Sequence, residues 1–378
     1  MSRLWRISAQ TRQFEPFSRE GTLLAADGAL ELDASALTST EPFPSGKEGG
    51  PPPVASYRFG KAILAEQPIP TGFNSAVPSV EALTPPGTWV RVMLAARVDG
   101  TWTKDYDFGP WATDKSTVSR RSVNGQEDAQ GNVFTDTLVL KKRADAVRVT
   151  LWLYSAQSGV SPRVRALSLA LTDGTRTPMD EPSDRLAWGT VLAVPGRSQM
   201  IYPNGGPVWC SPTSTTMLLG YWAQKLNRPE LVEAVPTAAA NTYDEVYEGT
   251  GNWSFNVAYA SAQGGGALHG TVARLDSFAQ VERLIAAGIP VSISIAYKEG
   301  ELTGGASRKS DGHLIVVKGF SPQGDVVVND PAFAADEQVE AIYKRDELWR
   351  AWRHSSGAVY LLWPAGTPLP EGALSPVP

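Results

Sequence analysis

Apolar and polar residues alternate in the first half of the chain. The alternation over residues 55–64, and in several runs between residues 88 and 171, predicts strands bounded by Gly, Asp, Asn or Pro. Strands spaced about ten residues apart predict an all-β sandwich or jelly-roll-like domain. The Asp27-Gly28 dipeptide predicts a hairpin within residues 21–37. The proline-rich stretch 67–89 predicts an extended connection.

Apolar residues recur at helical spacing in the second half, before a group of alternating runs. The spacing predicts helices over 210–223, 227–240, 277–287 and 346–353, and strands over 291–295, 312–320, 324–329 and 358–363. Ser277 and Gln280 have the spacing of a capping box. Helices followed by strands are typical of an α+β domain. The aromatic, glycine-broken stretch 243–261 predicts no regular element.

Polar and proline-rich segments divide the chain. Residues 172–184 predict a linker with a boundary near Pro182, and residues 45–53 predict a loop. We therefore expect a β-sandwich accessory domain over 1–181, an α+β domain over 182–365 and an extended, mobile tail over 366–378.

Composition narrows the class of protein. The net charge is −5, the pI is about 5.4 and no dense Lys/Arg run occurs, so the sequence predicts no nucleic-acid partner. It has no signal peptide and no run of 18 apolar residues, so we expect no membrane span and a cytoplasmic location, unless export uses another signal or route. Composition does not define an oligomeric state.

The only cysteine, Cys210, lies where a loop becomes a helix. We expect Ser211 as N-cap and Pro212 at the first helical position. A thiol at a helix N-terminus is favoured as thiolate, the reactive form. This position predicts a nucleophile, although a single cysteine beside an apolar helix is also compatible with an inert small core residue.

Three further residues suit a cysteine nucleophile. His313 opens an apolar strand, Asp330 ends the next strand, and Gln199 lies upstream of the cysteine. A tight turn joins the two strands, so the imidazole and the carboxylate can lie close together, and the carboxylate can then orient the imidazole. Each residue also has a structural alternative: a buried histidine, a turn-capping aspartate and a surface amide.

The order of these residues resembles that of the papain-like cysteine peptidases related to the bacteriocin-leader (double-glycine) peptidases, peptidase family C39. The shared motifs are Gln199, Cys210 at a helix start, Gly312-His313 and Asp330-Pro331, within residues 190–365. The resemblance implies a papain-like α+β fold for the second domain. It also implies Cys210 as nucleophile, His313 as base, Asp330 as orienting group and Gln199 as oxyanion donor, with no metal and no cofactor.

Two features depart from the family pattern. Ser211 replaces the glycine that more often follows the nucleophile, and the loop from Gln199 to Cys210 is longer. The leader peptidases are fused to a membrane transporter, and this sequence has no such segment, so only the hydrolase chemistry is carried over.

We therefore expect a cysteine peptidase that acts on a peptide or protein through a thioester acyl-enzyme. The alternatives are an amidase, cell-wall hydrolase or acyltransferase with the same triad, or a non-catalytic binding protein on the same fold. The predicted substrate-binding residues are Trp209, Asn252, Trp253 and Phe255, although a packed core connection fits the last three equally well.

Two features of the first half have competing interpretations. The polar loop 123–137 contains Glu127, Asp128 and Asp136 and is either a calcium site or, as we favour, a solvated loop. Several aromatic residues form either a platform for sugar or peptide or, as we favour, the sandwich core. These residues are Trp89, Trp102, Tyr106, Phe108 and Trp111.

Overall fold

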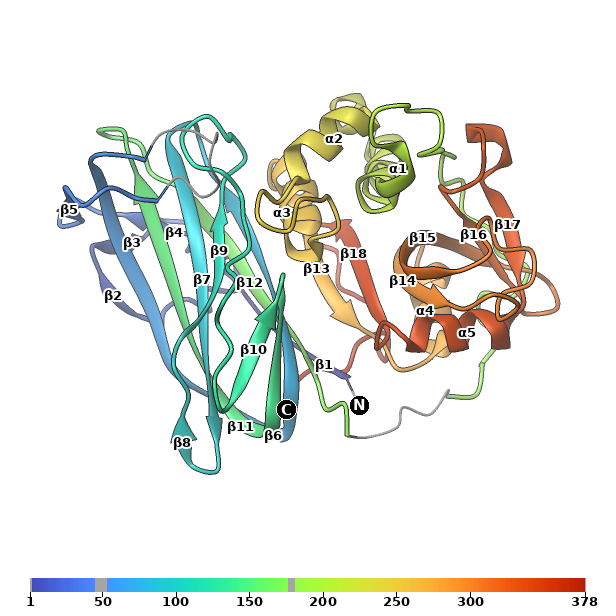
Figure 1. Ribbon diagram of the computed structural model, residues 1–378, viewed down its shortest axis with the longest axis horizontal. Coiled ribbons are helices and arrows are strands. Elements are labelled where there is room, and N and C mark those ends of the chain that lie inside the picture. Colours follow the sequence, from blue (N-terminus) through green and yellow to red (C-terminus); the bar gives the residue numbers. More distant parts are fainter. Residues whose placement is uncertain (1, 45–52, 176–180, 378) are drawn as a thin grey trace.

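The N-terminal half is built from antiparallel strands. The computed structural model describes residues 2–44, 53–175 and 181–377, and within residues 2–172 the described chain forms one twelve-stranded sheet. The long strand β6 pairs with β11 over residues 58–76 and with β12 over residues 75–83, so the sheet folds into a β-sandwich (Figure 1). The strands are β1 (Ser2–Ser8), β2 (Ser18–Glu20), β3 (Thr22–Leu24), β4 (Leu30–Leu32), β5 (Leu37–Ser39), β6 (Tyr57–Leu83), β7 (Thr88–Val98), β8 (Thr101–Trp102), β9 (Tyr106–Trp111), β10 (Gly131–Phe134), β11 (Thr137–Ser155) and β12 (Arg163–Thr172).

The predicted hairpin around Asp27-Gly28 is present as β3 and β4, but the predicted connection over 67–89 is wrong. Residues 67–83 continue β6 despite three prolines. Pro68 pairs with Ala146 beside two irregularities in the β6–β11 ladder, where a missing N–H costs little. Complete burial of Ile69, Phe73 and Val77 keeps the segment in the sandwich.

The C-terminal half combines helices with a six-stranded antiparallel sheet in the order β13-β18-β14-β15-β16-β17, counted over the described residues 181–377. Figure 1 shows helices α1 to α3 above this sheet and α4 and α5 at its lower side. The helices are α1 (Cys210–Leu226), α2 (Val235–Thr242), α3 (Trp253–Gln263), α4 (Phe278–Ala286) and α5 (Arg345–Arg353). The strands are β13 (Leu268–Arg274), β14 (Val291–Tyr297), β15 (Ser310–Phe320), β16 (Val326–Asn329), β17 (Glu340–Tyr343) and β18 (Ala358–Pro364).

Local signals predicted the second half unevenly. The capping box of α4 is confirmed, since the Ser277 hydroxyl accepts from Gln280 N and the Gln280 side chain accepts from Ser277 N. Helix α3 begins within the stretch 243–261, for which no element was predicted, and ends at Gln263. Its start depends on the side chain of Asn252, which accepts from Phe255 N.

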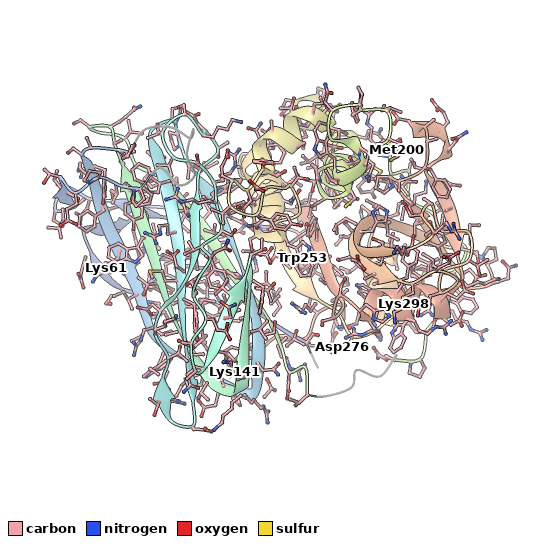
Figure 2. The ribbon with its side chains drawn as sticks, viewed as in Figure 1. Lys61, Lys141, Met200, Trp253, Asp276 and Lys298 are labelled. Atoms are coloured by element: carbon pink, nitrogen blue, oxygen red, sulfur yellow. The ribbon has the colours of Figure 1, made fainter. Side chains whose placement is uncertain are left out.

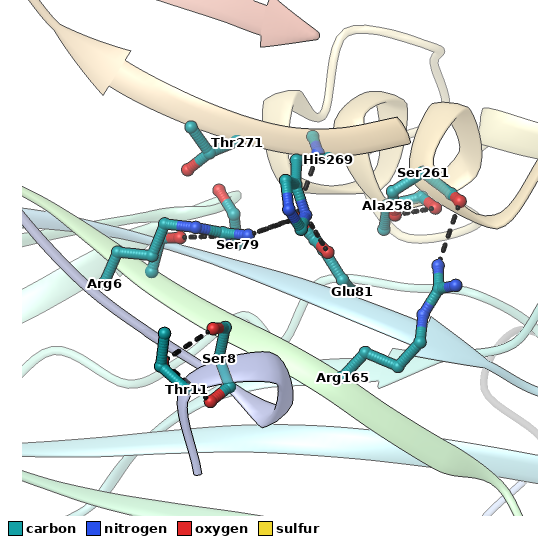
Figure 3. Close-up of polar contacts among 12 residues, drawn as sticks. Arg6, Ser8, Thr11, Ser79, Glu81, Arg165, Ala258, Ser261, His269 and Thr271 are labelled. Carbon is teal, nitrogen blue, oxygen red and sulfur yellow. Dashed lines mark hydrogen bonds and ion pairs between the residues drawn. The ribbon is translucent and has the colours of Figure 1, made fainter. Parts of the chain in front are cut away.

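A buried polar cluster joins the two halves (Figure 3). Glu81 of β6, only 2% exposed, accepts from Arg6 at 2.8 Å and from Gly270 N at 3.1 Å, and its carboxylate lies 3.1 Å from His269 Nδ1. Arg165 donates to the carbonyl of Ser261 nearby. Helix α3 packs against β6 on the same side of the sandwich, so the two halves share a continuous apolar core.

The tail is held against the fold, contrary to the prediction of a mobile end. Leu4 N donates to Ser375 O, Val377 N donates to Leu4 O, and Ala373 is fully buried. The predicted loop over 45–53 and the middle of the predicted linker, residues 176–180, lie outside the described residues except for Pro53. The domain boundary at Pro182 and the jelly-roll-like strand order stay predictions. Across the described ranges, no helix is long and apolar enough to cross a membrane.

Candidate active site

Cys210 is the first residue of α1, and its side chain is half-buried. The predicted cap is wrong: Trp209 occupies the N-cap position, whereas Ser211 lies inside the helix with its hydroxyl 2.7 Å from the Tyr360 hydroxyl. Ser214 Oγ donates to Leu314 O of β15 at 3.0 Å. This bond ties the first turn of α1 to the strand that carries His313.

His313 lies between the thiol and a carboxylate. Its Nε2 is 2.7 Å from Asp330 Oδ1, and the imidazole lies close enough to Cys210 for each group to shift the pKa of the other. Because Nε2 faces Asp330, Nδ1 is the ring nitrogen left to face the thiol. The predicted neighbours Cys210, His313 and Asp330 therefore form one connected chain of side chains.

Asp330 is fully buried at the end of β16 and accepts two further hydrogen bonds. Tyr343 donates its hydroxyl to Oδ2 at 2.7 Å, and Ala332 N donates to Oδ1 at 3.0 Å. Burial raises the pKa of Asp330, but the charge and hydrogen bond of His313, together with these two donors, lower the pKa overall. The carboxylate is therefore held in its ionised form.

The thiol and the imidazole stabilise each other's charged forms. Burial raises the pKa of Cys210, but the hydrogen bond and charge of His313, with backbone N–H groups of Leu314 and Ser211, lower it overall. Burial lowers the pKa of His313, but Asp330 and then Cys210 raise it overall. These opposite shifts favour a thiolate–imidazolium pair, which titrates as a unit.

Gln199 is buried but is not part of this chain of side chains. Its Nε2 donates to Pro207 O at 2.8 Å, while its Oε1 has no hydrogen-bond partner among the described residues. Gln199 does not line the cleft that contains Cys210. Its amide is therefore engaged by the loop that precedes α1, and its role as oxyanion donor stays a prediction.

A cleft of about 610 Å³ opens at Cys210. Of the four predicted substrate-binding residues, Trp253 lines it and lies at the boundary between the two halves (Figure 2). Asn252 is buried as the α3 N-cap, and Phe255 is buried against Trp111. Trp209 packs against Tyr202 and is not a lining residue. These positions do not favour substrate contact for Asn252, Phe255 or Trp209.

Two parts of this region were not identified from the sequence. Tyr343 lies on β17, for which no strand was predicted, and a tyrosine there carries no local signal of its partner. Residues 134–137, at the tip of the β10–β11 hairpin, line the same cleft although they belong to the N-terminal half. A cross-domain contact of this kind has no signature in sequence spacing.

For the two features of the first half that had competing interpretations, the loop 123–137 and the aromatic residues, the structure favours structural roles. Asp128 accepts from Tyr106 and from the backbone of Gln130 and Gly131, and Asp136 caps α3, so the loop carboxylates hold protein groups. No three metal-ligating side chains gather in the part of the chain that the structure describes. Of the five aromatic residues, all except the partly exposed Trp102 are buried in the sandwich.

Comparisons with known proteins identify both halves. The Peptidase C39 N-terminal domain matches residues 4–172, and the Peptidase_C39 like family matches residues 191–360. No curated protein matches the chain.

Solved structures add only distant similarities. A family two carbohydrate esterase from Cellvibrio japonicus is 14% identical over 54% of this chain and 44% of that chain, with a TM-score of 0.19. The catalytic unit of a GH87 alpha-1,3-glucanase from Streptomyces thermodiastaticus strain HF3-3 is 12% identical over 50% of this chain and 31% of that chain, with a TM-score of 0.18. This chain spans less than half the length of either.

The family matches agree with the resemblance carried by the Cys210, His313 and Asp330 motifs. The chain therefore carries a peptidase C39-like domain over residues 191–360, preceded by a peptidase C39 N-terminal domain, and the family indicates a cysteine-peptidase-like function.

Proposed function

We propose that this protein is a cysteine peptidase with a papain-like α+β second domain and a Cys210–His313–Asp330 triad. The single observation that carries the proposal is the position of His313, whose Nε2 is 2.7 Å from the Asp330 carboxylate and whose ring is near enough to the Cys210 thiol to lower its pKa. This is the order of groups that activates a thiol nucleophile.

The proposed reaction proceeds in two acyl-transfer steps. The Cys210 thiolate attacks the peptide carbonyl carbon, and the C–N bond then breaks while His313 gives its proton to the leaving amine. The resulting thioester is attacked by water, from which neutral His313 takes a proton, and the thiolate leaves. Asp330 holds the imidazole orientation throughout and stabilises its charged form.

The oxyanion is the remaining charge that needs a partner. The Cys210 backbone N–H at the start of α1 is one proposed donor, and a donor of this kind contributes about 3 kcal/mol to the transition state. Gln199 is the proposed second donor through the second N–H of Nε2, since the first is donated to Pro207.

A peptide-library digest tests the proposal. We expect the wild-type protein to release products, and Cys210→Ala and His313→Ala to lower kcat/KM by at least about 10⁴-fold. His354→Ala is the matched control, because His354 is exposed and outside the described site; its activity should equal that of the wild type.

Two results would contradict the proposal. Equal product formation by wild type and Cys210→Ala across the library indicates a non-catalytic binding protein. Cys210-dependent products from a peptidoglycan digest, with none from peptides, indicate a cell-wall amidase with the same triad.

A further inference from the structure

The cleft that opens at Cys210 has walls from both halves of the chain. Its C-terminal lining includes Val208, Tyr247 and Trp253, and Ser294 and Ser355 also line it. The N-terminal half contributes the tip of the β10–β11 hairpin and the start of β11, namely Phe134, Thr135, Asp136, Thr137 and Val139. Figure 1 shows β10 on the side of the sandwich that is turned toward α3.

Large exposed apolar side chains concentrate at this cleft. Phe134 is 60% exposed and Val139 is 40% exposed, although both project from a well-packed sandwich. Val208 and Tyr247, at 69% and 50% exposed, belong to the same lining. Exposed apolar residues scattered singly need no explanation, whereas several that line one hollow mark a binding site for an apolar group.

The hairpin is fixed in place. Asp136 Oδ2 accepts hydrogen bonds from the backbone N–H groups of Trp253 and Ser254, so a side chain of the sandwich caps a helix of the other half. A second tie lies nearby: buried Asp244 accepts from Ser122 N at 3.0 Å and from Asn252 Nδ2 at 2.9 Å. The wall formed by Phe134 and Val139 is therefore held at a set distance from the C-terminal half.

The charge of the lining residues narrows the class of ligand that the cleft can bind. Asp136, Glu248 and Asp311 line the cleft, and no Lys or Arg is among its described lining residues. Such a cleft disfavours an acidic ligand and accepts a neutral or basic one.

We propose that the β10–β11 hairpin is a specificity wall of the active-site cleft, where Phe134 and Val139 receive a large apolar side chain of a peptide, within two residues of the bond that Cys210 attacks. This inference rests on the proposed function and deepens it. The N-terminal domain is then part of the substrate site, with Phe134 and Val139 as specificity-determining residues.

Alkylation of the single cysteine by peptidyl vinyl sulfones tests the wall. Rate constants are measured for reagents that carry Leu, Phe or Gly at the two positions next to the electrophile, and for iodoacetamide as a reagent without a peptide. The proteins are the wild type, Phe134→Ala, Val139→Ala, the double variant and Leu37→Ala. Leu37 is the matched control, since it lies in the same half, is also 60% exposed and does not line the cleft.

We expect Leu or Phe reagents to react about tenfold faster than Gly reagents in the wild type. The preference should fall at least threefold in each single wall variant and disappear in the double variant, and it should be unchanged in Leu37→Ala. Iodoacetamide rates should be the same in all five proteins. Because Phe134 is exposed, its truncation leaves no core cavity, and an unchanged Tm verifies folding.

Binding to Cys210→Ala protein separates the two proposals. Peptide amides with Leu, Phe or Gly at the same positions are titrated by calorimetry into this background, with and without the wall substitutions. A preference for Leu or Phe that depends on Phe134 supports the wall even if the wild type cleaves nothing, a result that would overturn only the proposed function. Equal affinities for all peptides, or a preference that the double variant retains, would overturn the wall.

Discussion

At the residue scale, the candidate site depends on how three buried or half-buried groups share charge. Asp330, with Tyr343 as an additional donor, keeps a negative charge beside His313, and His313 in turn favours the thiolate of Cys210. The pKa of Cys210 is lowered and that of His313 is raised, so the thiolate–imidazolium pair exists between the two titrations. Activity should therefore follow a bell-shaped pH profile.

Asp330→Asn should narrow this profile from both sides. Without the carboxylate charge, the pKa of His313 falls and the alkaline limb moves to lower pH. A less readily charged imidazole stabilises the thiolate less, so the acid limb moves to higher pH. The kcat/KM profile of the variant measures both shifts, and we expect the maximum to fall by about 10²-fold or more.

Asp346→Asn is the control for this measurement, since Asp346 is exposed on α5 and pairs with Arg350. A profile for Asp330→Asn with both limbs at their wild-type positions would mean that the carboxylate does not tune the pair.

At the element scale, the hairpin and α3 stabilise each other. The carboxylate of Asp136 is buried against the α3 N-terminus, and burial, which outweighs its hydrogen bonds and the charge of Arg274, raises its pKa to about 6. A helix of the C-terminal half therefore depends on an acceptor supplied by the N-terminal half. The same contact positions the proposed specificity wall.

Asp136→Ala should destabilise the protein by about 1 kcal/mol, the usual effect of a lost helix cap, whereas Asp136→Asn keeps an acceptor and should cost less. The wild type and Asp136→Asn should also differ in pH dependence. The pKa of Asp136 is raised on folding, so its protonation contributes stability below about pH 4, and this contribution is lost as pH rises through about 6.

Denaturant unfolding of the wild type and of Asp136→Asn from pH 3.5 to 7.5 measures this difference. The unfolding free energy of the wild type should fall relative to that of Asp136→Asn over this range. A constant difference between them would contradict the raised pKa of the buried carboxylate.

Elements with strong local signals were predicted well, and those that depend on distant partners were not. The capping box at Ser277 and the strand that begins near His313 have their causes within a few residues. Continuation of β6 through Pro68 depends on burial against β11, and the capping of α3 by Asp136 spans 117 residues. Neither cause is visible in a local pattern.

The same distinction holds for the site. The tight turn between their strands allowed His313 and Asp330 to lie close together, and Cys210 was predicted at the start of a helix, where the structure has it. Phe134 and Val139 were not identified because their nearness to Cys210 arises only when the two halves pack together.

At the scale of the whole molecule, the interface between the halves holds the cleft together. Glu81 lies between Arg6 of its own half and His269 of the other, and it is nearly inaccessible to water (Figure 3). Burial raises the pKa of Glu81, but His269, Arg6 and Gly270 N lower it overall, so the carboxylate is ionised. The interface therefore depends on the buried, charged carboxylate of Glu81 and on the groups of both halves that bind it.

Glu81→Ala should lower the unfolding free energy by about 2 kcal/mol or more, because Arg6 loses its buried acceptor. Glu299→Ala removes an exposed ion pair with Arg308 and should change stability by less than about 1 kcal/mol. Thermal unfolding measures both. Equal Tm values for the two variants would mean that the buried cluster does not stabilise the interface.

The central claim, that Cys210 is an activated nucleophile, is tested most directly by the pH dependence of its alkylation. The chain has one cysteine, so iodoacetamide incorporation reports this thiol alone. We predict a reaction at neutral pH that is faster than that of a free thiol, with an apparent pKa below the ordinary cysteine value of about 8.5, and a shift toward that value in His313→Ala. A slow reaction with an apparent pKa near 8.5, unchanged in His313→Ala, would contradict the account.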